Sequence, residues 1–129
     1  MAAKKQGTRD LILAADDLRH EDVHVPEWGC TVRLKAMTGE ERDSFESSIL
    51  RDRSHPSSGV DPRNFHAKFL VRILCDADGK RLFSDDDVEL LSGKSASVLD
   101  RLYDVGASLA GLLPRDPERL AAVSYTHLR

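Results

Sequence analysis

The segment 62–74 constrains the fold of this chain more than any other, because it carries the strongest helical pattern in the sequence. Its apolar side chains recur at intervals of three and four residues: Phe65, Phe69, Leu70, Ile73 and Leu74. Side chains at this spacing share one face of an α-helix. So broad a stripe predicts a helix at the centre of the core, with Asp61 as its N-cap and Pro62 in its first turn.

Two stretches before this helix alternate polar and apolar residues, a pattern typical of strands. The apolar positions are Val23 and Val25 in the first stretch and Cys30, Val32, Leu34 and Ala36 in the second. A turn sequence, Pro26-Glu27-Trp28-Gly29, separates them. We therefore expect an antiparallel hairpin, which would be marginal alone and needs helices on its apolar face.

Capping signals mark further helices. Thr38 and Glu41 fit a capping box, in which each side chain bonds the backbone of the other residue. Phe45 and Ile49 follow one turn apart and are expected to face inward. Ser84 precedes three aspartates, so it is expected to cap a helix that runs through 91.

The last helix is expected to begin at Ser95 or Ser97, and its apolar positions are Val98, Leu99, Leu102, Val105, Leu109 and Leu112. One or two helical turns are also expected within 10–18. The sequence thus predicts an α+β fold, a small N-terminal antiparallel β-hairpin packed with about four α-helices. We divide the chain into a flexible arm (1–9), a single domain (10–113) and a C-terminal tail (114–129).

The composition suits one globular domain of a binding protein. Apolar residues make up 40% of the 129 and charged residues 32%, which is typical of a folded chain. The net charge of −3 makes nucleic acid an unfavourable main partner. No window approaches the ~20 apolar residues of a membrane span, and no signal peptide precedes Cys30 and Cys75, so both are expected as thiols in a cytosolic protein.

No motif supplies catalytic or metal chemistry. The run 76–87 has the length of a calcium loop, but its fifth, sixth and twelfth positions are Lys80, Arg81 and Asp87 instead of an oxygen ligand, Gly and Glu. The five histidines show no zinc-ligand spacing. We therefore predict no enzyme, no catalytic residues, no metal site and no cofactor. Arg51, Arg53, Arg63, Lys68 and Arg72 form a basic cluster that we interpret as a solvated face, with nucleic-acid binding as the minor alternative.

The order of these signatures resembles the tail assembly chaperones of long-tailed (siphovirus-type) bacteriophages or prophages. The resemblance covers 10–112 and rests on these elements: Val25-Pro26-Glu27-Trp28-Gly29, Thr31-Val32-Arg33-Leu34, Thr38-Gly39, Glu41-Arg42-Asp43, Phe45-Glu46, Ala67, Leu74-Cys75-Asp76, Gly79 and Arg81-Leu82-Phe83. It implies a small α+β domain that binds the tape-measure protein without catalysis and helps to recruit tail-tube subunits. It also implies self-association as a further property, a location in the host cell cytoplasm, and absence from the mature virion.

For the partner-binding surface we expect the end of the last helix, around Val105, Leu109, Leu112 and Leu113, to be shared between core and partner. The alternative is that this stripe is ordinary core. Two other function classes stay open: a minor structural component of the tail, and an enzyme or metal protein. The segment 124–129 is either translated library-adapter sequence or a frayed native tail.

Overall fold

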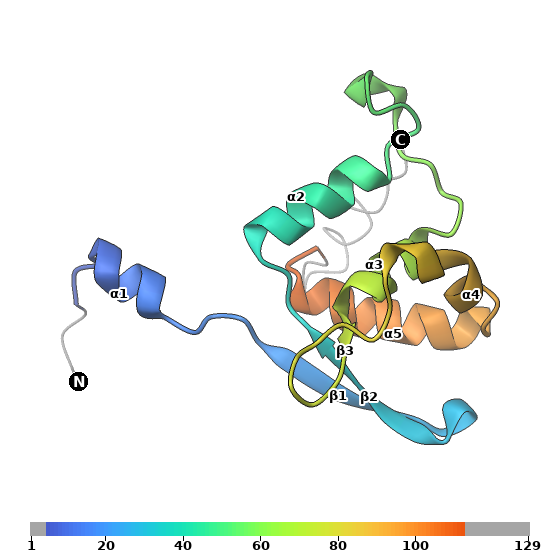
Figure 1. Ribbon diagram of the computed structural model, residues 1–129, viewed down its shortest axis with the longest axis horizontal. Coiled ribbons are helices and arrows are strands. Elements are labelled where there is room, and N and C mark those ends of the chain that lie inside the picture. Colours follow the sequence, from blue (N-terminus) through green and yellow to red (C-terminus); the bar gives the residue numbers. More distant parts are fainter. Residues whose placement is uncertain (1–4, 113–129) are drawn as a thin grey trace, which may run out of the picture.

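The computed structural model describes residues 5–112 and shows one three-stranded antiparallel sheet with helices packed on it (Figure 1). The strand order is β1-β2-β3, so β2 is central. The strands are β1 (His20–Val25), β2 (Cys30–Lys35) and β3 (Leu74–Cys75).

Five α-helices lie in the described part of the chain, and three short 3-10 helices accompany them. The α-helices are α1 (Arg9–Ala14), α2 (Gly39–Ser48), α3 (Phe65–Ile73), α4 (Val88–Ser92) and α5 (Ala96–Leu109), and the 3-10 helices are η1 (Pro26–Trp28), η2 (Pro56–Ser58) and η3 (Asp85–Asp87). All of α2 to α5 contribute buried side chains, whereas α1 contributes none. The predicted α+β class, a hairpin packed with about four helices, is confirmed.

The expected hairpin forms with Val23 opposite Val32. Gly29 ends η1 with φ 65°, a left-handed conformation that glycine adopts without steric cost. On the core-facing side Val32 and Leu34 are buried as predicted, but Cys30 is exposed. Cys30 comes directly after the turn, and although its cross-strand partner Val25 is buried, the alternation with Val32 does not bring Cys30 into the core.

The capping box at the start of α2 is confirmed in both directions. Thr38 Oγ1 accepts from the N–H of Glu41 at 3.1 Å, and Glu41 Oε1 accepts from the N–H of Thr38 at 2.9 Å. Phe45 and Ile49 are both buried. Local chemistry therefore determines where this helix begins, and its apolar face determines how it packs.

The start of α3 differs from the prediction. Asn64 adopts a left-handed conformation (φ 54°), so the helix begins at Phe65 and not at 61–62. The carboxylate of Asp61 instead accepts from the N–H of Arg63, which closes a turn ahead of the helix. The structure also ends α3 at Ile73, because Leu74 continues as the edge strand β3 opposite Leu34.

After β3 the chain turns sharply, as expected. Asp76 Oδ1 accepts from the N–H groups of Asp78 and Lys80, and Gly79 has φ 84°. Phe83 then packs against the core while Leu82 stays 51% exposed. After this turn the chain continues into η3 and α4.

The core lies where α3 and α5 cross the inner face of the sheet. Phe45, Phe69 and Tyr103 stack edge to face, with ring centroids 5.2–5.3 Å apart in each pair with Phe69. Beside them Gly106 of α5 presses against α3 and β2: a Cβ added there would lie 2.3 Å from Ile73 Cδ1 and 2.9 Å from Phe69 Cε2. Glycine is needed at this position because no space remains for a side chain.

We expect Gly106→Ala to lower the free energy of unfolding by about 1–3 kcal/mol, because overpacking a filled core outweighs alanine's better helix propensity. Ile73 and Phe69 are both fully buried and cannot move aside freely. Gly39→Ala is the matched control, since nothing lies within 4 Å of the added Cβ there. Urea denaturation of both variants measures the difference. Equal stability of Gly106→Ala and the parent protein would contradict the packing argument.

Candidate partner-binding surfaces

The structure places the predicted partner-binding residues against the core. Val105 and Leu109 are half-buried and contact the core cluster, and Leu112 is only 5% exposed. Its N–H donates to Ala107 O at 2.8 Å, which folds the chain after α5 back onto the helix. Leu113 lies outside the described residues. The role of this stripe in partner binding stays a prediction.

The largest group of exposed apolar side chains lies on α1 and the segment that follows it. Leu11 is 48% exposed, Ile12 66%, Leu13 67% and Leu18 47%. In Figure 1 this N-terminal arm (residues 5–18) extends away from the rest of the molecule, and only the segment that leads into β1 approaches the sheet. Three apolar residues in a row span too wide an angle for one helix face, so Leu11 to Leu13 cannot all be buried against a single surface of the same domain. The sequence shows that residues 11–13 are apolar and predicts a short helix there, but it does not predict that the fold leaves these side chains exposed.

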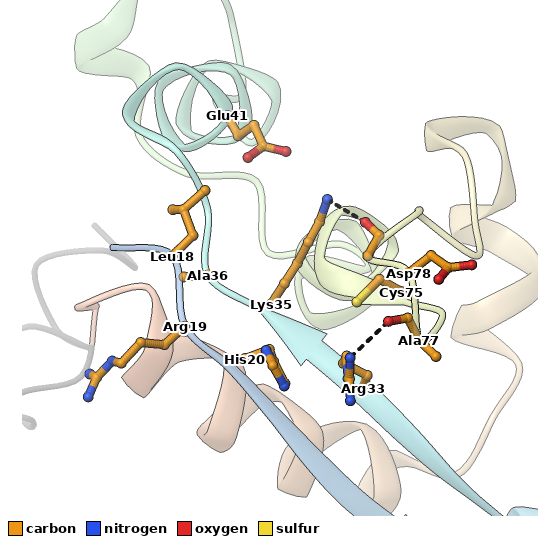
Figure 2. Close-up of a pocket in the computed structure, with 11 residues that line it drawn as sticks. Leu18, Arg19, His20, Arg33, Lys35, Ala36, Glu41, Cys75, Ala77 and Asp78 are labelled. Atoms are coloured by element: carbon orange, nitrogen blue, oxygen red, sulfur yellow. Dashed lines mark hydrogen bonds between the residues drawn. The ribbon is translucent and has the colours of Figure 1, made fainter. Parts of the chain in front are cut away.

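A small cavity lies where the arm joins the sheet (Figure 2). Its volume is about 260 Å³, and its lining includes Leu18, Arg33, Lys35 and Cys75. Arg33 Nη1 donates to Ala77 O at 3.0 Å and Lys35 Nζ donates to Gly79 O at 3.2 Å. Both cations therefore hold the turn after β3 in place.

The two cysteines are free thiols, Cys30 exposed and Cys75 buried. Burial raises the pKa of the Cys75 thiol, which keeps it protonated at neutral pH and disfavours the nucleophilic thiolate. Cys75 is therefore a packing residue in this cavity and not a reactive group.

Ser54, His55 and Asp52 meet on one exposed loop, yet their geometry is unsuited to nucleophilic catalysis. His55 Nδ1 lies 2.9 Å from Asp52 Oδ2 and 3.1 Å from Ser54 Oγ. A catalytic triad needs the carboxylate and the hydroxyl on opposite ring nitrogens, whereas here both share Nδ1. The same carboxylate also accepts from the Ser54 N–H at 3.0 Å, so the three residues form a local turn.

Within residues 5–112 no group of three or more His, Cys, Asp or Glu side chains is arranged to hold a metal ion. Over the same residues, no helix combines the length and the apolar run needed to cross a bilayer.

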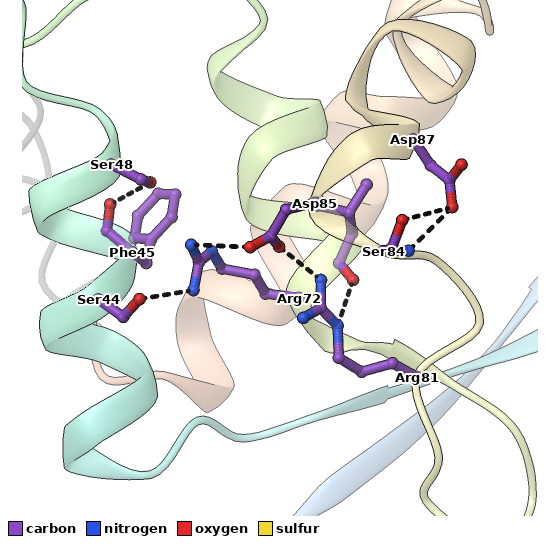
Figure 3. A network of polar contacts seen from close by, with 9 residues as sticks. Ser44, Phe45, Ser48, Arg72, Arg81, Ser84, Asp85 and Asp87 are labelled. Carbon is purple, nitrogen blue, oxygen red and sulfur yellow. Dashed lines mark hydrogen bonds and ion pairs between the residues drawn. The ribbon is translucent and has the colours of Figure 1, made fainter.

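A second cavity, of about 190 Å³, lies between α2, α3 and η3. Figure 3 shows the network of polar contacts beside it. Arg72 lies between Ser44, whose Oγ is 3.2 Å from Nη1, and Asp85, whose Oδ2 is 3.6 Å from Nη2. Arg81 donates to the other oxygen of Asp85 at 2.8 Å and to Val71 O at 3.0 Å. The hydrogen bond from Arg81 is the largest cause of a lowered pKa at Asp85, and the positive charge of Arg72 adds to it.

Comparison with known proteins relates this chain to a protein family and to a solved structure. A family model described as phage tail assembly chaperone matches residues 7–121. Among solved structures, the tail assembly chaperone of bacteriophage HK97 superposes with a TM-score of 0.53 and 27% sequence identity, over 71% of this chain and 85% of that one. No curated protein sequence matches. The family resemblance expected from the sequence is confirmed.

The lowered pKa of Asp85 predicts acid sensitivity. Because the unfolded chain takes up a proton near pH 3.8 and the folded chain only below that, the stability that Asp85 contributes is present above pH 3.8 and is lost as the pH falls further. Asp85→Asn should therefore be less stable than the parent at pH 7, and the gap should narrow at about pH 3.

Urea midpoints at the two pH values measure this gap. Asp86→Asn is the matched control, since the Asp86 carboxylate makes no hydrogen bond or ion pair with any residue that the structure describes. A gap that stays constant between the two pH values would contradict the role given to the Arg72–Asp85–Arg81 cluster.

Proposed function

Because this chain belongs to the phage tail assembly chaperone family, we propose that it acts as a non-catalytic chaperone that binds the tape-measure protein and helps to recruit tail-tube subunits. The observation that carries the proposal is the N-terminal arm, with four exposed apolar side chains and no buried residue in α1. A helical, apolar-striped partner needs an accessible apolar surface on its chaperone, and the arm offers one.

The length of α1 supports a binding role. A helix of six residues is marginal in water, because fewer than two turns form too few hydrogen bonds to offset the free-energy cost of helix nucleation. Thr8 caps it, with Oγ1 accepting from the N–H of Leu11 at 3.3 Å, but no tertiary contact buries its apolar side chains. Burial of Ile12 and Leu13 against a helical partner would supply the missing stabilisation.

The end of α5 is the second proposed contact. Val105 and Leu109 are half-buried, so each keeps an accessible part that a partner could cover, and Leu113 follows outside the described residues. Leu112 is buried in the core, so its substitution would test folding before it tests binding.

We expect Ile12→Asp/Leu13→Asp to abolish co-purification with the tape-measure protein while the thermal unfolding midpoint stays within about 2 °C of the parent, because exposed positions contribute little to stability. Leu90→Asp is the matched control: Leu90 is 74% exposed, but it lies on α4, away from the arm. Leu109→Asp tests the second surface separately. If the folded arm variant still binds and Leu109→Asp does not, the contact lies at α5 and the arm proposal is wrong.

The proposed chaperone acts in the host cell cytoplasm and leaves before the particle is complete. Mass spectrometry of purified particles should therefore find tail-tube and tape-measure peptides but none from this chain. Peptides of this chain at constant stoichiometry would indicate a structural tail component instead. Light scattering of the purified protein measures self-association in parallel.

A further inference from the structure

The cavity between α2, α3 and η3 concentrates positive charge on a chain whose net charge is −3. We call it the basic cleft, lined by Arg53, Lys68, Arg72 and Asp85 together with the apolar side chains Val71 and Val88. We propose that the basic cleft binds an acidic segment of a partner polypeptide, so that one or two of its carboxylate side chains enter the cleft. The inference rests on the proposed function in one respect, since it takes the chain's task to be the binding of other polypeptides.

The charges in the cleft are not balanced by the described residues. Asp85 is the one carboxylate among the described lining residues, and it already pairs with both Arg81 and Arg72. Neither Arg53 nor Lys68 forms an ion pair with any residue in 5–112. An incoming carboxylate would therefore meet two cations, Arg53 and Lys68, without having to displace an ion pair between described residues.

The positive field extends past the cleft toward the loop before α3. The pKa of Asp61 is lowered first by the N–H of Arg63, and the charges of Lys68, Arg63 and Arg51 lower it further. Of the basic cluster that the sequence suggested, Arg53, Lys68 and Arg72 meet at the cleft.

The cleft is also pre-formed. Figure 3 shows Arg72 between α2 and η3, bonded to Ser44 on one side and Asp85 on the other, and its side chain is only 13% exposed. A guanidinium held in this way loses little conformational entropy when a ligand arrives.

Size and lining favour a carboxylate side chain over nucleic acid. A volume of about 190 Å³ is below the usual range of cofactor sites, which begins at about 300 Å³, so one or two side chains fill it. Val71 and Val88 can cover the methylene groups of a glutamate, while the cations face its carboxylate. None of the described lining residues is aromatic, whereas single-stranded nucleic acid is usually bound by base stacking.

The test uses the whole protein and a hexaglutamate peptide, with binding measured by calorimetry at low and moderate salt. We expect saturable binding that weakens as NaCl is added. Arg53→Glu/Lys68→Glu should weaken it by at least about tenfold, because two attractive charges become repulsive. Arg72 is left intact, because it also supports the fold through Ser44 and Asp85.

Lys80→Glu/Lys94→Glu is the matched control, since it makes the same change in net charge with residues that do not line the cleft. We expect it to bind hexaglutamate within about threefold of the parent, because distant exposed charges are screened by salt. Circular dichroism and urea denaturation verify that both double variants are folded.

Three results would overturn the inference: no saturable binding of hexaglutamate, equal weakening by the two double variants, or tighter binding of a decauridine RNA than of the peptide. The co-purification experiment with the tape-measure protein separates this inference from the proposed function. If the tape-measure protein co-purifies but hexaglutamate does not bind, only the cleft is wrong. If hexaglutamate binds in the cleft but the tape-measure protein does not co-purify, only the proposed function fails.

Discussion

The close approach of α5 to α3 and β2 at Gly106 is the contact on which the rest of the structure depends. A sheet with two strands of six residues and one of two residues cannot persist without cover on its apolar face. Helices α3 and α5 supply that cover, and they can lie this close only because Gly106 leaves room for Ile73 and Phe69. The ring of Phe45 extends the same packing to α2, and Leu91 of α4 belongs to the same cluster, so one cluster joins the sheet to four helices.

The core is formed by apolar side chains, and the polar and charged side chains of the described residues lie at or near the surface. No charged or polar residue is fully buried among those described, and the ion pairs connect elements at the surface. Arg33 joins Asp22 across the hairpin at 2.8 Å and also holds the turn after β3, while Arg101 joins Glu27 at 2.7 Å. Such exposed pairs contribute little free energy each, so they orient segments whose stability comes from the core.

Two surfaces lack a partner within the described part of the molecule: the apolar side chains of the N-terminal arm are uncovered, and two cations of the basic cleft, Arg53 and Lys68, form no ion pair. They suit different parts of a binding task. Burial of apolar surface contributes most of the affinity for a partner but is non-directional. Paired charges, in contrast, direct the approach and the register of the partner. The chaperone role proposed above would use both surfaces, because the charged contact is sensitive to ionic conditions and the arm is short.

Much of this structure follows from interactions between residues that are close in the sequence, so it can be predicted from the sequence. The capping box of Thr38 and Glu41, the Gly29 and Gly79 turns and the stripe of α3 depend on neighbours within a few residues, so hydrogen bonding and periodicity determine them. Other features depend on residues far apart in the chain. The ending of α3 at Ile73 depends on the pairing of Leu74 with Leu34, and the need for glycine at 106 arises only once three elements meet there. Tertiary packing likewise decides that Leu11 to Leu13 are exposed and that Arg53, Lys68 and Arg72 line one cleft. A sequence pattern shows which side chains are apolar or charged, but it does not show which surfaces the fold leaves uncovered.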